Sequence, residues 1–418
     1  MKINRQKLKN GSNLTIIDLP DSLSLTLLAL SRSGPRFDPN KKEGLSHFVE
    51  HLILDGSGKF RDKNETARIL EKEGIITGAF SYQETNSYWM RGMKDSWPLM
   101  VRVLTEQIQN PLFRDEDVKT EKEIVKDELR LLIDNPDSNI WEIWAENVWQ
   151  GTPLGRSFIG DSNIMESFTR IDVVNHFKNN YLASDTELVV CGDVSGGDLT
   201  DLLNKNLVKF DRSSPRAILP VVVKREKPIN VCYQDTEGMT VAYGFLTTRM
   251  ADDDVIVLEV IENILAGGWG SLLRREIFQT GLTYSIECYN RNLSDTGYLM
   301  NLFTCDKNNL NKIIQLINNQ LKLIKDGNLN QIEIDRAKGF LSGSLILNNE
   351  KSDDLANWFG YQKMFNSEKV LTPKEKCERV SKISNEAIVR VANKYFTDKN
   401  WYLSLIGQIE ESEIKVGL

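Results

Sequence analysis

The chain has 418 residues, which is enough for two or three domains with cores of their own. It carries 52 Lys and Arg against 59 Asp and Glu, a formal charge of −7. This balance argues against a protein that binds nucleic acid unspecifically, because phosphate contacts need clustered positive charge. Apolar residues make up 40% and charged residues 27%, as in an ordinary globular protein. Histidine is scarce, with three residues in the chain: His47, His51 and His176.

The N-terminus and the cysteines indicate where the protein works. Residues 1–10 contain no apolar stretch of the kind that a secretory signal needs. No apolar run approaches the roughly 18 residues that span a bilayer, so we expect no membrane insertion. The five cysteines are odd in number and form no CxxC pair. Free thiols in a reducing compartment, the cytoplasm, are therefore expected.

The first half of the chain alternates between strand-like and helix-like segments. Apolar runs at 14–17, 23–30 and 187–192 indicate strands. A segment from 78 to 90, rich in Phe, Tyr and Trp, indicates another strand. Apolar periodicity predicts helices at about 43–54, 64–74, 95–108 and 114–134. Mixed strands and helices of this kind predict an α+β domain over residues 1–210.

The second half repeats this plan after a linker at 211–228, which holds three prolines. A strand is expected at 239–246 and an apolar helix at 254–266, within a second α+β domain over residues 229–418. The run His47–Gly56 lines up with Glu259–Gly268. This match indicates an internal duplication with histidines only in the first copy. Two unrelated apolar helices that both end in glycine are the alternative.

His47 and His51 lie four residues apart in the expected helix 43–54, and Glu50 directly precedes the second histidine. At about 100° per residue, His51 lies roughly 40° and Glu50 roughly 60° to either side of His47. The three side chains therefore share one face. Two neutral imidazoles suit a divalent metal, with the glutamate free to act on its bound water. Two buried, hydrogen-bonded histidines are the other interpretation, but HxxEH is a known zinc-peptidase pattern.

The segment 114–134 carries two carboxylates on its apolar face. Measured from Val118, Glu121 and Glu128 fall at roughly −60° and −80°, within a sector of apolar side chains. That sector holds Val118, Ile124, Val125, Leu129, Leu131 and Leu132. A carboxylate that faces a core is costly unless a cation satisfies it. A buried Arg or Lys could do so, but the histidine pair favours one glutamate as a zinc ligand and the other as its support.

With these residues in place, the chain resembles the pitrilysin family of zinc metallopeptidases, peptidase family M16, nearly from end to end. The motif stands here as His47-Phe48-Val49-Glu50-His51. Further family-like runs are Gly44-Leu45-Ser46, Pro153-Leu154-Gly155-Arg156, Gly281-Leu282-Thr283-Tyr284-Ser285 and Asp335-Arg336-Ala337-Lys338. The resemblance implies two homologous α+β domains, each a largely antiparallel sheet packed with helices, of which only the first binds zinc.

The resemblance also implies the zinc site. The family's third ligand, about 77 residues after the second histidine, falls on Glu128, and its supporting glutamate falls on Glu121. One zinc per chain would then be held by His47, His51 and Glu128. Glu50 would take a proton from the attacking water and give it to the leaving amine.

Two more parts of the catalytic machinery come from the resemblance. In relatives a second-domain tyrosine stabilises the oxyanion, and this role falls on Tyr284. The substrate would pair as an added strand along Gly78, Ala79, Phe80 and Ser81. The chain departs from the family pattern at Ile277, where relatives have an arginine, and at Gly78, where they often have an asparagine. Arg274, Arg275 or a partner subunit could supply the missing charge.

The implied activity is zinc-dependent endopeptidase action on peptides or unfolded polypeptides, in a chamber between the two halves. A non-catalytic or partner-dependent subunit of a heteromeric processing peptidase is the alternative. Short relatives work as homodimers or as heterodimers with a related chain, so we expect self-association or such a partner. His176 lies outside every motif and is expected to be structural.

Overall fold

A computed structural model describes residues 1–194, 198–208, 218, 220–223, 225–365 and 369–416. The chain forms two compact units, each built from several stretches of sequence. The first unit comprises Met1–Leu131, Arg156–Ala217 and Asn349–Val370, and the second comprises Leu132–Gly155, Ile218–Asn348 and Leu371–Leu418. The boundaries expected at 210 and 229 stay a prediction, and residues 211–217, 219 and 224 of the expected linker lie outside the described residues.

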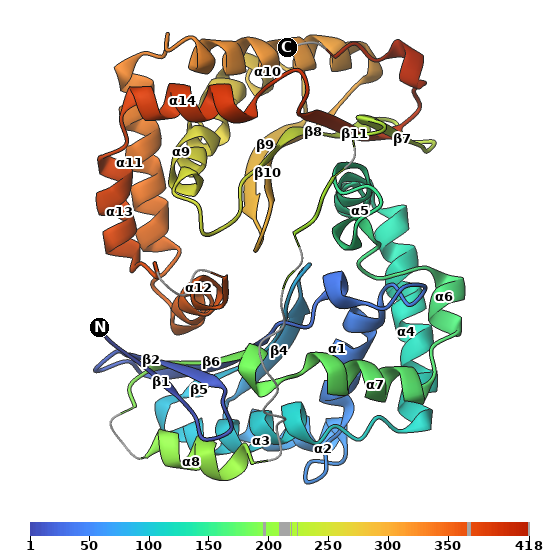
Figure 1. Cartoon of the computed structure of the whole chain (residues 1–418), viewed down its shortest axis with the longest axis vertical. Coiled ribbons are helices and arrows are strands. Elements are labelled where there is room, and N and C mark those ends of the chain that lie inside the picture. The colour runs from blue at the N-terminus through green and yellow to red at the C-terminus, as the bar shows by residue number, and fades with distance from the viewer. Residues whose placement is uncertain (195–197, 209–217, 219, 224, 366–368, 417–418) are drawn as a thin grey trace. The chain divides into compact units, whose positions relative to one another are not determined.

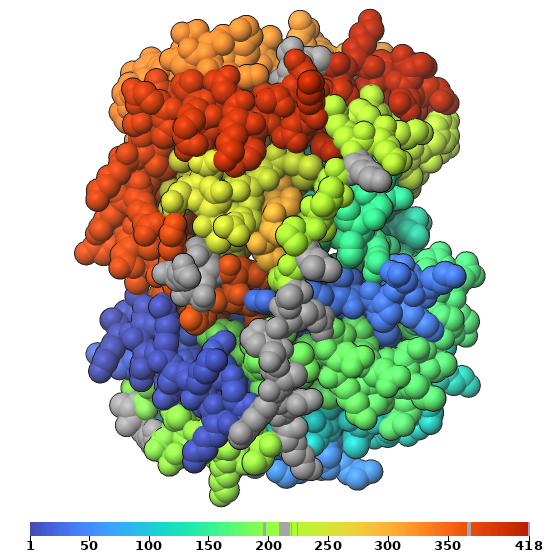
Figure 2. Space-filling model, viewed as in Figure 1, coloured from blue at the N-terminus to red at the C-terminus, as the bar shows by residue number. Residues whose placement is uncertain are grey.

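Over its described residues, the first unit contains a six-stranded sheet in the order β1-β2-β6-β3-β5-β4 (Figure 1). The strands are β1 (Lys2–Lys7), β2 (Asn13–Asp18), β3 (Ser24–Ser31), β4 (Ile76–Ser81), β5 (Asn86–Met93) and β6 (Thr186–Gly192). β2 and β6 run parallel, and the other neighbours are antiparallel. β1 and β4 are the edge strands, and β1 is largely exposed on the face seen in Figure 2.

Helices of the first unit come from both ends of the chain. They are α1 (Leu45–Asp55), α2 (Lys63–Lys72), α3 (Trp97–Gln109), α4 (Asp115–Asp134), α6 (Ser162–Glu166), α7 (Arg170–Asn180), α8 (Leu199–Asn206) and α12 (Ser352–Phe365). α12 lies against β3 and β6, where Phe359 packs with Leu28 and Val189. Its Gly360 sits so close to Leu30 that a Cβ would collide with that side chain.

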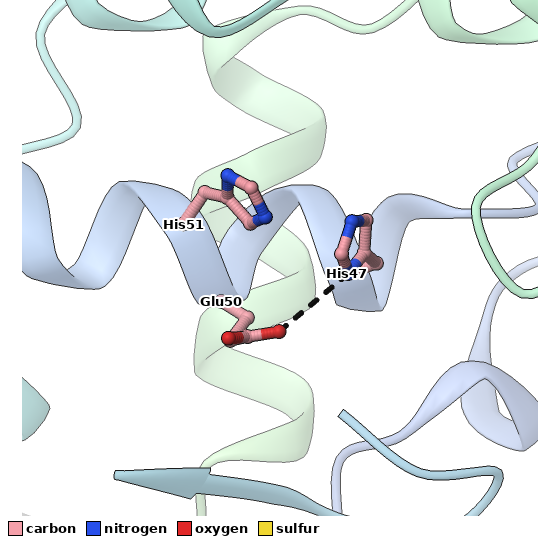
Figure 3. Close-up of side chains that lie close together, drawn as sticks. All are labelled: His47, Glu50 and His51. Atoms are coloured by element: carbon pink, nitrogen blue, oxygen red, sulfur yellow. Dashed lines mark ion pairs between the residues drawn. The ribbon is translucent and has the colours of Figure 1, made fainter. Parts of the chain in front are cut away.

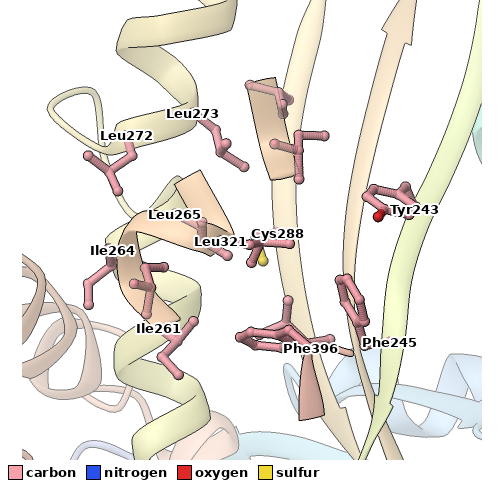
Figure 4. Packing of buried hydrophobic residues seen from close by; sticks show 14 of the residues in the cluster. Tyr243, Phe245, Ile261, Ile264, Leu265, Leu272, Leu273, Cys288, Leu321 and Phe396 are labelled. Atoms are coloured by element: carbon pink, nitrogen blue, oxygen red, sulfur yellow. The ribbon is translucent and has the colours of Figure 1, made fainter. Parts of the chain in front are cut away.

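The second unit contains a five-stranded sheet over the described residues, in the order β7-β11-β8-β10-β9. Its strands are β7 (Ile229–Tyr233), β8 (Met239–Thr247), β9 (Ser285–Asn292), β10 (Gly297–Cys305) and β11 (Trp401–Gly407). Its helices are α5 (Pro136–Val148), α9 (Asp254–Ala266), α10 (Leu310–Lys325), α11 (Gln331–Leu347), α13 (Pro373–Ser381) and α14 (Asn385–Tyr395). The core between sheet and helices is large and apolar, as Tyr243, Phe245, Ile261, Leu265 and Phe396 illustrate (Figure 4).

One helix from each half of the chain packs in the unit that the other half mainly forms. α5 precedes the expected linker, yet it lies against β8 and β11, where the Asn147 side-chain amide donates to the Leu403 carbonyl at 2.9 Å. α12 follows that linker and packs in the first unit. Both halves also run through the same order, namely a central strand, a helix and an edge hairpin: β3, α1 and β4–β5, then β8, α9 and β9–β10. This shared order supports the duplication.

The expected α+β class with two domains is confirmed. The helices expected at 43–54, 114–134 and 254–266 are α1, α4 and α9, within two residues at each end. The single strand expected over 78–90 is wrong, because the chain turns at residues 82–85 between β4 and β5. No Gly or Pro marks this turn. It is held by a buried ion pair from Arg36 to Glu84 at 2.7 Å. Among the described helices, none is long and apolar enough to cross a membrane.

The exchanged helix α12 should determine the stability of the first unit. Phe359 is fully buried against that unit's sheet, so we expect Phe359→Ala to lower its free energy of unfolding by about 3–5 kcal/mol. Urea unfolding measures this loss, with Lys363→Ala on the same helix as the control. A loss below about 1 kcal/mol, within the range of surface substitutions, would contradict this packing.

Candidate functional site

Helix α1 begins at a buried carboxylate. Asp38 accepts hydrogen bonds from the Gly44 and Ser46 backbone N–H groups, each at 2.8 Å, and from the Ser46 hydroxyl at 2.6 Å. Burial raises the pKa of Asp38 to about 7, although these bonds favour its charged form. Gly44 has φ of 88°, and a Cβ there would collide with the Ile159 carbonyl, so this entry into the helix needs glycine. The first turn of α1 is therefore fixed from outside the helix.

α1 then presents His47, Glu50 and His51 on one face (Figure 3). Their candidate ligand atoms all lie within 4.8 Å of one another. In the described parts of the chain, no other group of three or more His, Cys, Asp or Glu residues meets this condition. The two imidazole rings are 4.6 Å apart, and His47 and Glu50 are buried. The spacing expected from the sequence is thus present in three dimensions.

Glu128 of α4 faces both histidines. Its Oε2 lies 3.2 Å from Nε2 of His47 and 3.7 Å from Nε2 of His51. Ligands of a tetrahedral zinc, with bonds of about 2.0–2.1 Å, lie about 3.3 Å from one another. The two distances from the Glu128 oxygen are therefore close to the separation of ligands that share one zinc ion.

The same contacts shift the ionisation of these groups. Burial lowers the pKa of His47, but the neighbouring carboxylates of Glu128 and Glu50 outweigh burial and raise the pKa to about 9. The bond from His47 lowers the pKa of the Glu128 carboxyl. The carboxylates thus favour a positive charge at His47, which a proton or a metal ion can supply.

Glu121, about two helical turns before Glu128, contacts the other nitrogen of His51. Its Oε1 lies 2.7 Å from Nδ1, and its side chain is buried. Because a carboxylate only accepts, Nδ1 carries the proton and the lone pair remains on Nε2, which faces Glu128. The helical wheel of α4 therefore selected two carboxylates that meet the histidine pair. The rest of its apolar sector was partly wrong, since Val118 and Val125 are buried while Ile124 and Leu131 are exposed.

The expected substrate strand is the edge strand β4, whose last residue contacts Glu50. Ser81 donates from Oγ to Oε2 of Glu50 at 2.6 Å. Gly78, Ala79 and Phe80 precede it and pair with β5 on one side. A Cβ at Gly78 would lie about 2.8 Å from the Trp89 ring, so that ring occupies the space of any larger side chain. A larger side chain at this position would therefore have to displace the Trp89 ring.

Tyr284 belongs to the second unit, whereas the other candidate site residues belong to the first. It is 67% exposed, and its hydroxyl donates to Asp306 at 3.0 Å, a bond that raises its pKa. Ile277 is fully buried in the second core. Of the two arginines nearby, Arg275 pairs with Glu333 at 2.6 Å, and Arg274 stacks over the ring of Trp269.

Sequence reasoning missed the groups behind α1. Nε2 of the buried His176 lies 3.2 Å from the Ser46 hydroxyl, which also bonds Asp38. This placement agrees with the structural role expected for His176. Asn86, at the start of β5, donates to the Ser46 carbonyl at 2.9 Å and to the Tyr181 hydroxyl at 2.8 Å. Isolated polar residues such as these carry no motif, so only the fold reveals them.

Comparisons with known proteins show which family and which solved structures the chain is similar to. Residues 26–162 match the family model described as insulinase (peptidase family M16), and residues 167–341 match the peptidase M16 inactive domain. An uncharacterized zinc protease of Rickettsia felis is 26% identical, covering 94% of this chain and 95% of that protein. A probable mitochondrial-processing peptidase subunit beta of Arabidopsis thaliana is 24% identical, covering 91% of this chain and 73% of its own length. Among solved structures, a protease from Helicobacter pylori has a TM-score of 0.88 at 20% identity, covering 97% of this chain and 99% of that one.

Asp38 should make the stability of the protein depend on pH. Its pKa is about 7 when folded and about 3.9 in an unfolded chain. Between these values the folded state binds more protons, so the contribution of this carboxyl to stability falls as the pH rises from about 4 to about 7. Urea unfolding gives the free energy of unfolding of the wild type and of Asp38→Asn. We expect the value for the wild type minus the value for the variant to be lower at pH 8 than at pH 5. If this difference were equal or larger at pH 8, the assignment would be refuted.

Glu121 should affect metal binding through His51. Glu121→Gln removes the carboxylate that accepts from Nδ1, so we expect zinc affinity to fall by about 10–100-fold. Competition with a chromophoric chelator measures this affinity. Glu123→Gln, on the exposed face of the same helix, is the matched control and should bind zinc as the wild type does. Equal affinity of all three proteins would show that Glu121 does not support the site.

Proposed function

The chain belongs to peptidase family M16, and from that premise we propose that it is a zinc-dependent endopeptidase acting on peptides or unfolded polypeptides. One observation carries the proposal. Oε2 of Glu128 lies 3.2 Å from Nε2 of His47 and 3.7 Å from Nε2 of His51, close to the separation of zinc ligands, and a buried carboxylate, Glu50, lies beside the two histidines. A site that only stabilised the fold would not need a further buried acid at this place.

The chain's own residues would divide the work as follows. His47, His51 and Glu128 would hold one zinc, with Glu121 fixing the tautomer of His51. Bound zinc supplies polarisation of a water molecule and of the scissile carbonyl. Glu50 would accept a proton from the attacking water and return it to the leaving amine.

An unfolded substrate is proposed because β4 is an edge strand. Its outer backbone groups, along Gly78 to Ser81, can pair only with an extended segment. A folded domain rarely offers a free strand of this kind, whereas a peptide or an unfolded chain does. We propose Tyr284 as a donor to the oxyanion, a role that the resemblance to the family implies. Its side chain is exposed, and its hydroxyl donates to Asp306 in this structure.

A partner-dependent subunit is the second candidate. Two observations favour it: several relatives are named as beta subunits of a mitochondrial-processing peptidase, and the buried Ile277 replaces an expected arginine. For either candidate we propose that the chain works in the cytoplasm as a homodimer, with a heterodimer of related chains as the alternative. Size-exclusion chromatography at micromolar concentration tests it, and an active, strictly monomeric protein would contradict it.

The proposed general base gives the most direct functional test. We expect the purified wild type to carry about one zinc per chain and to cleave a peptide library, with products read by mass spectrometry. Glu50→Gln should retain the zinc and lose cleavage by at least about a hundredfold, since the proton acceptor is gone. Full activity of this variant would refute the role of Glu50. A wild type with zinc but without cleavage, alone or with a partner, would favour the non-catalytic subunit.

A further inference from the structure

We propose that Ser81 is a positioning residue that holds the carboxylate of Glu50 and ties it to the strand on which the peptide pairs. The proposal rests on the proposed function, because it concerns the orientation of the proposed base. It also gives Ser81 a role different from the substrate contact expected from the sequence.

The contact itself is short and has a clear direction. Ser81 Oγ lies 2.6 Å from Oε2 of Glu50, the length typical of a hydroxyl that donates to a charged carboxylate. Oε2 also lies 3.5 Å from Nδ1 of His47, beyond an ordinary hydrogen bond. The hydroxyl of Ser81 is therefore the group that fixes which way the Glu50 carboxylate turns.

The backbone beneath this contact is held at a second point. Ser81 pairs with Asn86 at the closed end of the β4–β5 hairpin. The Asn86 amide donates to the Ser46 carbonyl in the first turn of α1, one residue before His47. The hairpin thus bonds to α1 both at its first turn and at Glu50. Because this backbone is fixed, the short serine side chain loses little conformational entropy when it holds the carboxylate.

Geometry also separates a positioning role from a substrate contact. A peptide added to β4 would bond the outer backbone groups of the strand, which lie in the plane of the sheet. The Ser81 side chain leaves that plane and reaches the α1 residue Glu50. Removal of its hydroxyl should therefore impair the chemical step and leave peptide binding unchanged.

The test uses the zinc-loaded full chain with Ser81→Ala, Ser81→Thr and the control Ser22→Ala. The hydroxyl of Ser22 donates to the Ser24 carbonyl at the start of β3, elsewhere in the first unit. We expect Ser81→Ala to lower kcat about tenfold, less than the roughly 100- to 10,000-fold contribution of a general base, because the carboxylate itself remains. KM should stay within about twofold and zinc content should not change. Ser81→Thr keeps the hydroxyl and should restore most of kcat, and Ser22→Ala should match the wild type. A raised KM with unchanged kcat, or no change at all, would overturn the proposal.

Crystal structures of zinc-depleted wild type and Ser81→Ala give a second readout that needs no activity. We expect the Glu50 carboxylate to leave its wild-type position in the alanine variant, and an unmoved carboxylate would overturn the proposal. If the wild type cleaves nothing, the proposed function fails on its own. The comparison of the two crystal structures then still decides whether Ser81 positions Glu50.

Discussion

The candidate site depends on carboxylates placed around two imidazoles that one helix presents side by side. Glu128 and Glu121 of α4 contact His47 and His51 at 2.7–3.7 Å. Burying carboxylates costs free energy unless positive charge meets them. Histidines accept either a proton or a metal ion, and two of them fixed four residues apart favour the metal, because both can coordinate at once. Carboxylates buried without a cation would destabilise the protein. Their burial beside the two histidines thus favours the proposed zinc.

The second copy of the repeat meets the same electrostatic problem without histidines. On α9 the matching residues are Glu259, Glu262 and Asn263. Glu259 pairs with Lys376 at 2.6 Å, and burial raises the pKa of Glu262 to about 7. Glu259 is thus balanced by a lysine, and Glu262 by a raised proton affinity, where the first copy has histidines beside its acids. The contrast agrees with a single proposed zinc per chain, in the first unit.

Local sequence patterns predicted which side chains lie together at the site better than they predicted the groups that support it. A helix of 3.6 residues per turn places His47, Glu50 and His51 on one face, and the same rule selected Glu121 and Glu128. This rule could not predict that Leu131 is exposed, because a helical wheel does not show which residues of an apolar sector pack against another element. The turn between β4 and β5 was missed because a long-range ion pair holds it, and no local turn residue marks it. The exchange of α5 and α12 between the units was missed for the same reason, since it depends on contacts far apart in sequence.

A zinc-edge anomalous difference map from a crystal of the purified protein tests the metal assignment most directly. The account predicts one strong peak per chain, about 2.0–2.2 Å from Nε2 of His47, Nε2 of His51 and an oxygen of Glu128. It also predicts that Nδ1 of His51 stays bonded to Glu121, as it is at 2.7 Å here. A peak on other residues, or a zinc that Glu128 does not reach, would contradict the assignment.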